Sequence, residues 1–293
     1  MTEFDDLVLA EDPEPGIRRL TLNRPEKRNA MSNELRTRLF DLLRAADADR
    51  DVRVIIIRGA GKAFCAGYDL GRPRDTSTTL SHHSAINDGY WARHVVAGWF
   101  EMWDYATPII AQVHGFCLAG GTELATAADL VYVAEDAQIG YPATRLISPP
   151  DMCWQPWLLG MRRAMEAVLT GDPLSGIEAV TAGFANRAYP AEQLDEKVLA
   201  HARRVAKIPR DIQATNKRAI HRSMEAMGIR NGIRAAADIQ AVALRTRSST
   251  QYMAELAQGV TQALTARDAP FGDYRTASDA TNDKGPPIPN GRA

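Results

Sequence analysis

The stretch from Pro108 to Asp129 constrains this chain most, because it runs from an apolar strand through a glycine-rich turn into a helix. It reads PIIAQVHGFCLAGGTELATAAD, in which Gly120 and Gly121 separate the apolar run from a series of small residues. The first N–H groups of a helix lack intrahelical partners and carry a partial positive charge. Glycine has no Cβ, so an oxygen atom can approach those N–H groups closely. The stretch therefore predicts a site for a negatively charged oxygen, with one acid, Glu123, in the first helical turn.

A second segment has the same construction. Residues 52–70 read VRVIIIRGAGKAFCAGYDL, so a β-branched run leads through Gly59 and Gly61 into the turn AGYD at 66–69. β-Branched residues favour a strand, and the glycines again leave backbone N–H groups accessible. Two such turns can hold one oxygen atom between their N–H groups, which is how an oxyanion hole is built.

Strand and helix patterns alternate over residues 1–199. Apolar runs predict strands at 17–22, 52–58, 109–113 and 130–134. A leucine stripe after Ser32 predicts a helix with that serine as its N-cap, and residues 91–105 predict another helix. Residues 72–87 are rich in Ser, Thr, Pro and His and predict a loop. Alternation of this kind is typical of an α/β fold with stacked βα units.

From about residue 200 the strand patterns disappear. Helices are expected at 200–208, 212–227, 232–244 and 252–266, with Pro209 separating the first two. We therefore divide the chain into an α/β core at 1–199, a helical region at 200–275 and a tail at 276–293. The tail is polar and proline-containing, and is expected to be disordered.

Composition excludes several classes of protein. The formal net charge of −1 argues against a nucleic-acid-binding protein, which would need a strongly basic face. We find no apolar run of the roughly 18 residues that a membrane helix needs, and the acidic N-terminus does not resemble a signal peptide. The three cysteines are odd in number and widely spaced, which favours reduced thiols in the cytoplasm.

Six segments together resemble the enoyl-CoA hydratase/isomerase, or crotonase, superfamily. AFCAGYDL and GFCLAGGTEL resemble its two oxyanion-hole loops, and the similarity continues through LNRPEKRNAM, DLVYVAEDAQIGYP, VLTGDPLSGIEAVTAGFANR and ARDAPFGDY. The resemblance implies a spiral of ββα units with a C-terminal helical oligomerisation region. It also implies that the N–H groups of Tyr68 and Gly120 bind a thioester carbonyl and stabilise an enolate.

The same resemblance implies a substrate and an assembly. The substrate would be an acyl-CoA thioester, so coenzyme A enters as part of the substrate, with no permanent cofactor and no metal. The assembly would be a homotrimer or a hexamer made of two trimers, with Arg267 or Phe271 reaching a neighbour's site. The implied coenzyme A contacts are Lys27, Arg28, Ala30, Lys62, Ala66, Asp69, Leu70, Arg267 and Phe271. Tyr141 and Trp154 are the implied acyl-pocket residues.

One departure from the family pattern bears on mechanism. Hydratases of this superfamily use two glutamates, and Glu123 occupies the first position, but Ala143 occupies the second. Alanine cannot transfer a proton, so a hydration that uses paired glutamates cannot run here unchanged. Asp151, eight residues later, resembles in its position a catalytic aspartate of other members of the superfamily. We therefore expect Glu123 and Asp151 to form the acid/base pair.

Simpler roles for these residues stay open. Glu123 could only complement the helix dipole, and Asp151 could only begin a turn or cap a helix. Three functions are compatible with the sequence: an enzyme of the hydratase/isomerase type, an acyl-CoA hydrolase on the same fold, and a protein that binds acyl-CoA without chemistry.

Overall fold

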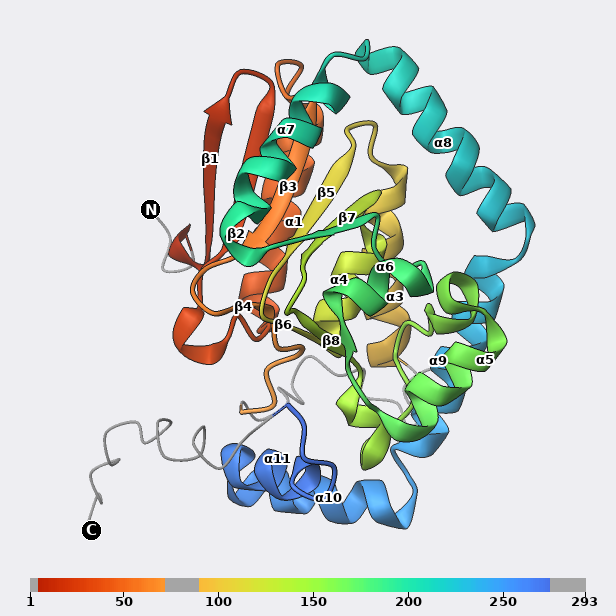
Figure 1. The fold of residues 1–293 in the computed structure, drawn as a ribbon. Helices are drawn as coiled ribbons and strands as arrows, with labels where there is room; N and C mark the ends of the chain where they lie inside the picture. The colour runs from red at the N-terminus through yellow and green to blue at the C-terminus, as the bar shows by residue number, and fades with distance from the viewer. Residues whose placement is uncertain (1–4, 72–89, 275–293) are drawn as a thin grey trace.

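The computed structural model describes residues 5–71 and 90–274, and a six-stranded sheet lies at its centre (Figure 1). The strand order is β1-β2-β3-β5-β7-β10, in which only the pair β1 and β2 is antiparallel. These strands are β1 Val8–Glu14, β2 Ile17–Leu22, β3 Val54–Gly59, β5 Ile109–Val113, β7 Leu130–Ala134 and β10 Arg187–Tyr189. All four strands predicted from the apolar runs are confirmed within two residues.

A second sheet of four short strands completes the spiral. Its order is β4-β6-β8-β9, formed by Ala63–Cys65, Phe116–Leu118, Gln138–Gly140 and Leu174–Ser175. Each turn of the chain gives one strand to the large sheet and the next to the small sheet, as in β3–β4, β5–β6 and β7–β8. A helix follows the second and third turns: α4 (Gly120–Ala127) comes directly after β6, and α5 (Gln155–Thr170) comes after a 3₁₀ turn at Pro142–Arg145 and the segment 146–154. The predicted spiral of ββα units is confirmed.

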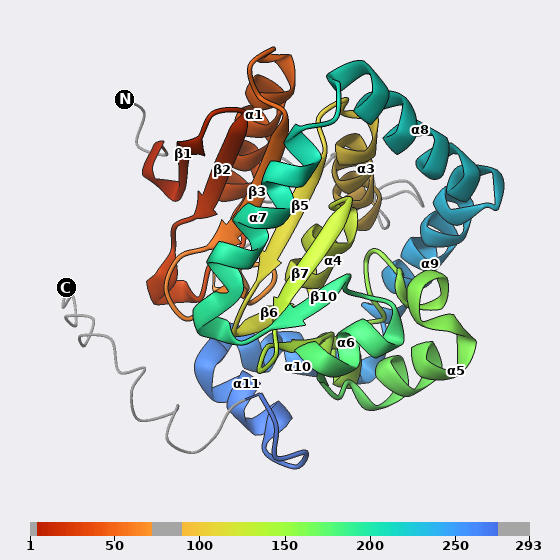
Figure 2. The ribbon, with the colours of Figure 1, turned by 45° about the horizontal axis from the view of Figure 1, so that its top comes forward.

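Helices cover both faces of the large sheet. Figure 2 shows α7 (Leu194–Ala206) in front of it and α1 (Asn33–Ala48) and α3 (Tyr90–Asp104) behind it. Three consecutive isoleucines of β3, residues 55–57, are fully buried, as expected for a parallel strand that is covered on both faces. Ser32 caps α1 as predicted, since its hydroxyl accepts a hydrogen bond from the Leu35 N–H at 3.3 Å.

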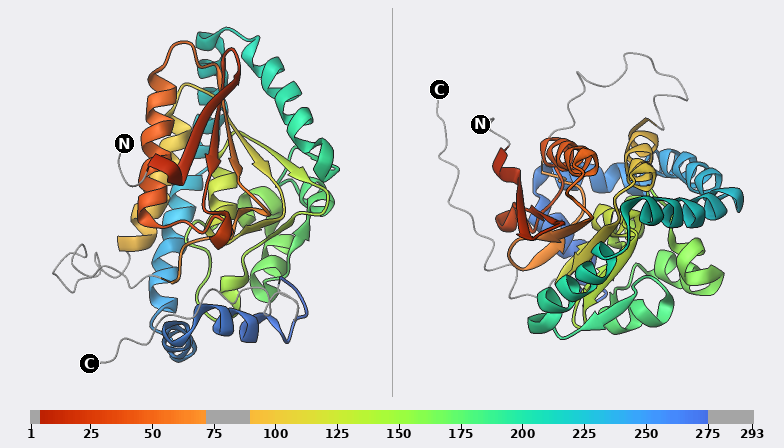
Figure 3. Two further views of the ribbon diagram at one scale, coloured as in Figure 1. Left: turned by 90° about the vertical axis from the view of Figure 1, so that its left-hand side faces the viewer. Right: turned by 90° about the horizontal axis from the view of Figure 1, so that it is seen from above.

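The C-terminal helices lie along one side and one end of the molecule (Figures 1 and 3). After α6 (Gly176–Ala182) and α7 come α8 (Arg210–Ala226), α9 (Ile229–Ala243), α10 (Arg247–Gln258) and α11 (Val260–Asp268). The single helix expected over 252–266 is instead divided between α10 and α11, because Gly259 has an extended backbone with φ 176° and ψ 107°. The expected boundary at residue 200 lies inside α7, whose Val198 and Ala202 belong to the main hydrophobic core.

Two hydrophobic clusters follow from this arrangement. The main cluster runs through the sheets and α1, α3, α7 and α9, whereas Tyr252, Leu256 and Ala263 form a small cluster between α10 and α11. Leu146 and Ile147 pack against the small cluster and connect it to the segment after β8. The loop expected at 72–87 and the tail at 276–293 lie outside the described residues. No helix of the described chain is long and apolar enough to cross a membrane.

Candidate active site

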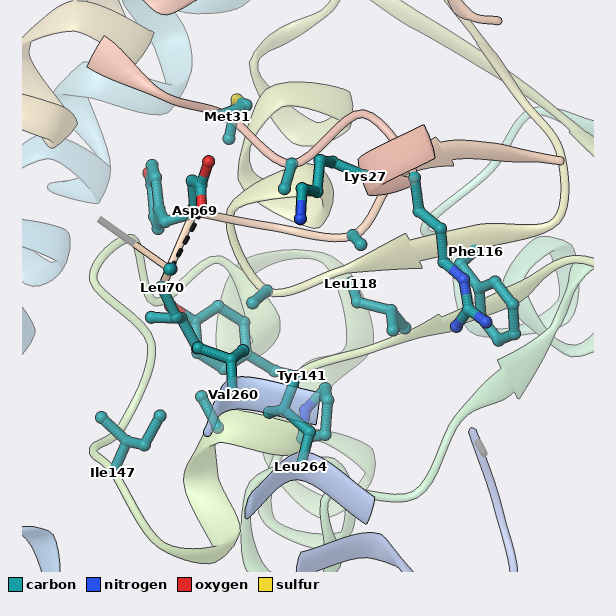
Figure 4. A pocket seen from close by; sticks show the side chains of 18 of the residues that line it. Lys27, Met31, Asp69, Leu70, Phe116, Leu118, Tyr141, Ile147, Val260 and Leu264 are labelled. Carbon is teal, nitrogen blue, oxygen red and sulfur yellow. Dashed lines mark hydrogen bonds between the residues drawn. The ribbon is translucent and has the colours of Figure 1, made fainter. Parts of the chain in front are cut away.

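A cavity of about 570 Å³ lies where the small sheet meets α9 and α11. Figure 4 shows Lys27 and Phe116 at one side of it and Ile147, Val260 and Leu264 at the opposite side. Its wall includes most of the site residues expected from the sequence: Lys27, Arg28, Ala30, Ala66, Tyr68, Asp69, Leu70, Tyr141, Asp151 and Arg267. Residues separated by up to 240 positions in the chain therefore meet at one place.

The two glycine-rich loops touch one another at this cavity. A Cβ on Gly120 would come within 2.7 Å of the Tyr68 ring and 2.8 Å of Met31 Cε. A Cβ on Gly121 would come within 2.4 Å of the Cys65 carbonyl oxygen. All three distances are too short for real atoms, so the close approach of α4 to the loop after β4 requires glycine at these positions.

Backbone hydrogen bonds orient the two N–H groups that we expected to form the oxyanion hole. The N–H groups of Thr122 and Glu123 both donate to the Ala119 carbonyl, at 2.8 and 3.3 Å, so this carbonyl points along α4. The Ala119 carbonyl and the Gly120 N–H belong to one trans peptide group, in which the two bonds point in opposite directions. The Gly120 N–H therefore points away from α4. Ala119 itself has φ 47°, a conformation that alanine rarely adopts and that costs roughly 1–3 kcal/mol.

The N–H of Tyr68 is oriented by a parallel bridge with Met31. The Met31 N–H donates to the Gly67 carbonyl at 2.8 Å, and the Asp69 N–H donates to the Met31 carbonyl at 3.0 Å. In a parallel bridge the residue between these two bonds points its own N–H to the other side. The Tyr68 N–H thus points away from Met31, and Tyr68 and Ala119 both line the cavity.

Glu123 is fully buried in the first turn of α4, and four donors surround its carboxylate. Oε2 accepts hydrogen bonds from the Tyr68 phenol at 2.5 Å and the Trp99 indole N–H at 3.3 Å. Oε1 accepts from the Tyr141 phenol at 2.9 Å and the Met152 N–H at 3.2 Å. Burial raises the pKa of this carboxyl, while the hydrogen bonds oppose that rise by stabilising the charged form.

Asp151 lies in the cavity wall and is joined to Glu123 through Tyr141. Asp151 is only 5% exposed. Its backbone N–H donates to the Tyr141 hydroxyl at 3.3 Å. Tyr141 donates in turn to Glu123, so the backbone of Asp151 is linked through Tyr141 to the Glu123 carboxylate. Ala143 also lines the cavity, at the position where the sequence lacks a second glutamate.

The turn before α1 supplies two basic residues of the cavity, Lys27 and Arg28. Arg28 has its guanidinium carbon 5.0 Å from the centre of the Phe116 ring, and its carbonyl accepts a hydrogen bond from the Ala66 N–H. Asp69 forms an ion pair with Arg24 at 2.9 Å and accepts the Gly71 N–H at 2.9 Å, the bond drawn in Figure 4. The Asp69 carboxylate is therefore fixed by Arg24 and by the Gly71 N–H.

Gly120, Glu123 and three further expected site residues do not line the cavity. Lys62 is an exposed residue of the turn before β4. Trp154 is buried behind α4, where its indole N–H donates to the Thr122 hydroxyl at 3.2 Å and its ring packs against Phe184. Phe271 lies over the Arg145 guanidinium, with 3.7 Å between that group's carbon and the ring centre.

The C-terminal helices contribute wall residues that the sequence did not reveal. They come from the end of α9 and from α11: Gln240, Leu244, Val260, Thr261, Leu264 and Asp268. Arg267, which comes from α11, lines the cavity of its own chain. Within the described residues no group of three or more His, Cys, Asp or Glu side chains could hold a metal ion.

Comparison with known proteins gives this cavity a context. The family model described as enoyl-CoA hydratase/isomerase matches residues 12–273. A protein of Rhizobium meliloti named "Probable enoyl-CoA hydratase" is 34% identical over 225 residues, covering 76% of this chain and 83% of its own. "Enoyl-CoA hydratase, mitochondrial" of Pongo abelii is 31% identical over 213 residues, covering 70% and 69%.

Solved structures agree. A crystal structure of an enoyl-CoA hydratase from Mycobacterium smegmatis superposes with a TM-score of 0.85 at 28% identity, covering 94% of this chain and 98% of the other. A monofunctional enoyl-CoA isomerase from M. smegmatis gives a TM-score of 0.62 at 26% identity, covering 75% and 94%. The similarity therefore includes both hydratases and an isomerase, and this chain belongs to the enoyl-CoA hydratase/isomerase family.

Proposed function

We propose that this protein acts on acyl-CoA thioesters by stabilising an enolate. The observation that supports the proposal is that the two glycine-rich loops pack together at Gly120 and the Tyr68 ring, while Tyr68 and Ala119 line the cavity. Two such donors are worth about 3 kcal/mol or more each when charge develops on a bound carbonyl oxygen. Protons would be handled by Glu123 and Asp151, and coenzyme A is part of the substrate, without a permanent cofactor.

The basic turn is the proposed site for the phosphates of coenzyme A. Lys27 and Arg28 lie in the wall, whereas Lys62 is exposed and outside it, which offers a matched pair of variants. We expect Lys27→Ala to weaken coenzyme A binding about fivefold, a change of about 1 kcal/mol, and Lys62→Ala to change it less. Isothermal calorimetry measures both, and equal affinities of an acyl-CoA and its free acid would remove the basis of the proposal.

The reaction type is tested with a panel of enoyl-, dienoyl-, 3-hydroxyacyl- and aromatic acyl-CoA thioesters. Chromatography and mass spectrometry distinguish addition of water, a shifted double bond and release of free coenzyme A. Addition of water or a shifted double bond supports hydratase/isomerase activity. Release of coenzyme A alone identifies a hydrolase, and thermal stabilisation by acyl-CoA without turnover identifies a binding protein.

Assembly as a trimer or hexamer is the proposal for the quaternary structure. Met161, Met165 and Leu169 are exposed at successive i, i+4 positions of α5, and form an apolar stripe on one helix face. Light scattering at micromolar concentration that finds only a monomer would reject this assembly.

A further inference from the structure

Glu123 has no surface at the cavity. It is 0% exposed, and it is not among the residues of the described chain that line the cavity. A carboxylate that is enclosed in this way cannot itself touch the substrate in this arrangement, because proton transfer requires hydrogen-bond distance between the exchanging atoms. Any proton that passes between substrate and Glu123 must therefore pass through another group.

Tyr68 occupies the position between Glu123 and the cavity. Its side chain is partly exposed and lines the cavity, and its phenol donates to Glu123 Oε2 at 2.5 Å. The end of the same ring covers Gly120, where a Cβ would come within 2.7 Å of Tyr68 Cε2 and Cζ. The phenol thus lies beside the N–H group that is proposed to bind the thioester carbonyl.

We propose that the Tyr68 phenol is a catalytic residue that relays a proton between the substrate and Glu123. The proposal rests on the proposed function. The bond from hydrogen to the carbon next to the thioester carbonyl breaks, and that proton bonds to the Tyr68 oxygen. At the same time the proton of the Tyr68 hydroxyl passes to Glu123 Oε2. Tyr68 ends neutral, Glu123 ends protonated, and the electron pair of the broken bond forms the enolate.

The surroundings of both groups suit such a relay. The Trp99 indole N–H lies 3.1 Å from the Tyr68 oxygen and 3.3 Å from Glu123 Oε2, so it stabilises negative charge on either atom. Burial raises the pKa of Glu123, which favours its acceptance of a proton. Tyr141 also donates to Glu123, but it is only 5% exposed, whereas Tyr68 is partly exposed.

The test measures exchange of the protons next to the carbonyl of butyryl-CoA in D₂O by mass spectrometry. This saturated probe cannot be hydrated, so the readout reports enolate formation alone. Tyr68→Phe keeps the backbone N–H and the ring, and we expect it to slow exchange at least about 100-fold while butyryl-CoA binding stays nearly unchanged. Tyr105→Phe is the matched control, because Tyr105 does not line the cavity. The phenol that it removes donates a hydrogen bond of 2.8 Å to Glu101. The control should exchange at the wild-type rate.

The relay also predicts that the two residues act as a unit. The double variant Tyr68→Phe with Glu123→Gln should exchange within roughly threefold of Tyr68→Phe alone, because each change interrupts the same path. Wild-type exchange in Tyr68→Phe, or losses that multiply in the double variant, would overturn the proposal. If the wild-type protein binds no acyl-CoA and catalyses no exchange, the proposed function itself is wrong.

A second variant covers the case in which Tyr68→Phe does not fold. Replacement of Tyr68 by 3-fluorotyrosine keeps the ring and the hydroxyl and makes the phenol more acidic. A proton relay predicts a changed exchange rate and a shifted pH–rate profile. An unchanged rate and profile would mean that Tyr68 only packs against Gly120.

Discussion

Arg145 holds the C-terminal helices against the cavity, and its removal gives the sharpest test of how the site is assembled. Its side chain is 3% exposed and carries the Phe271 ring on its guanidinium. It donates to Asp273 at 2.7 and 2.6 Å, to Asp268 at 3.2 Å and to Asp172 at 3.0 Å. Asp268 ends α11, so these bonds join the segment after β8 to the helix that supplies one wall of the cavity.

The free energy at stake in Arg145→Met can be worked out from these contacts. Removal of one partner of a buried ion pair costs about 3–5 kcal/mol. Asp268 is 1% exposed but keeps a second partner, because Arg267 donates to it at 2.7 and 2.8 Å. Asp172 is 58% exposed, and its bond contributes at most about 1 kcal/mol. The loss should therefore lie at the lower limit, about 3 kcal/mol.

Native-state hydrogen exchange measures this loss locally. α10 and α11 have their own small hydrophobic cluster, so they can open without the main core. We expect their amides to exchange about 100-fold faster in Arg145→Met, which corresponds to about 3 kcal/mol. Arg203→Met is the control, because it removes an exposed pair with Glu14 and should leave the exchange of α10 and α11 at the wild-type rate. Wild-type exchange of α11 in Arg145→Met would refute the reasoning.

Three further outcomes follow from the structure. Gly120→Ala should lower kcat about 10²-fold or more, measured by steady-state kinetics, because its Cβ would displace the Tyr68 ring; wild-type kcat would contradict this. Asp151→Asn should lower kcat about 10²-fold with little loss of acyl-CoA binding, and unchanged turnover would mean that this residue only forms a turn. Ala143→Glu should raise the rate of crotonyl-CoA hydration. Glu178→Gln should lower the urea midpoint of unfolding at pH 7, because the N-cap of α6 lowers the pKa of this carboxyl. The expected loss in the free energy of unfolding is about 0.5 kcal/mol. That contribution is present above the unfolded pKa near 4.5 and is lost as the pH falls through the lowered folded pKa, so an equal deficit at low pH would contradict it.

The sequence by itself determined the strands of the core and the glycine-rich turn that begins α4, and its resemblance to the crotonase superfamily implied the spiral. The strands and the turn depend on local chemistry: β-branched runs such as 54–57 form strands, and Gly120 begins a helix whose first N–H groups are accessible. The sequence also showed that alanine occupies position 143, because the identity of a residue needs no coordinates. The helical character of the C-terminal third followed from its apolar periodicity, although the break at Gly259 did not, since an interior glycine costs a helix only about 1 kcal/mol.

Only the tertiary structure decided which groups reach the cavity. Glu123 has the pattern of an accessible helix N-terminal acid, but Trp99 from α3 and Tyr68 from the loop after β4 enclose it. Trp154 was expected in the acyl pocket, but its indole N–H bonds to Thr122 behind α4, because a buried donor needs an acceptor. Arg267 reaches the cavity of its own chain because the Arg145 cluster fixes α11 there. These placements depend on contacts between residues as many as 240 positions apart, and periodicity along the chain carries no information about such contacts.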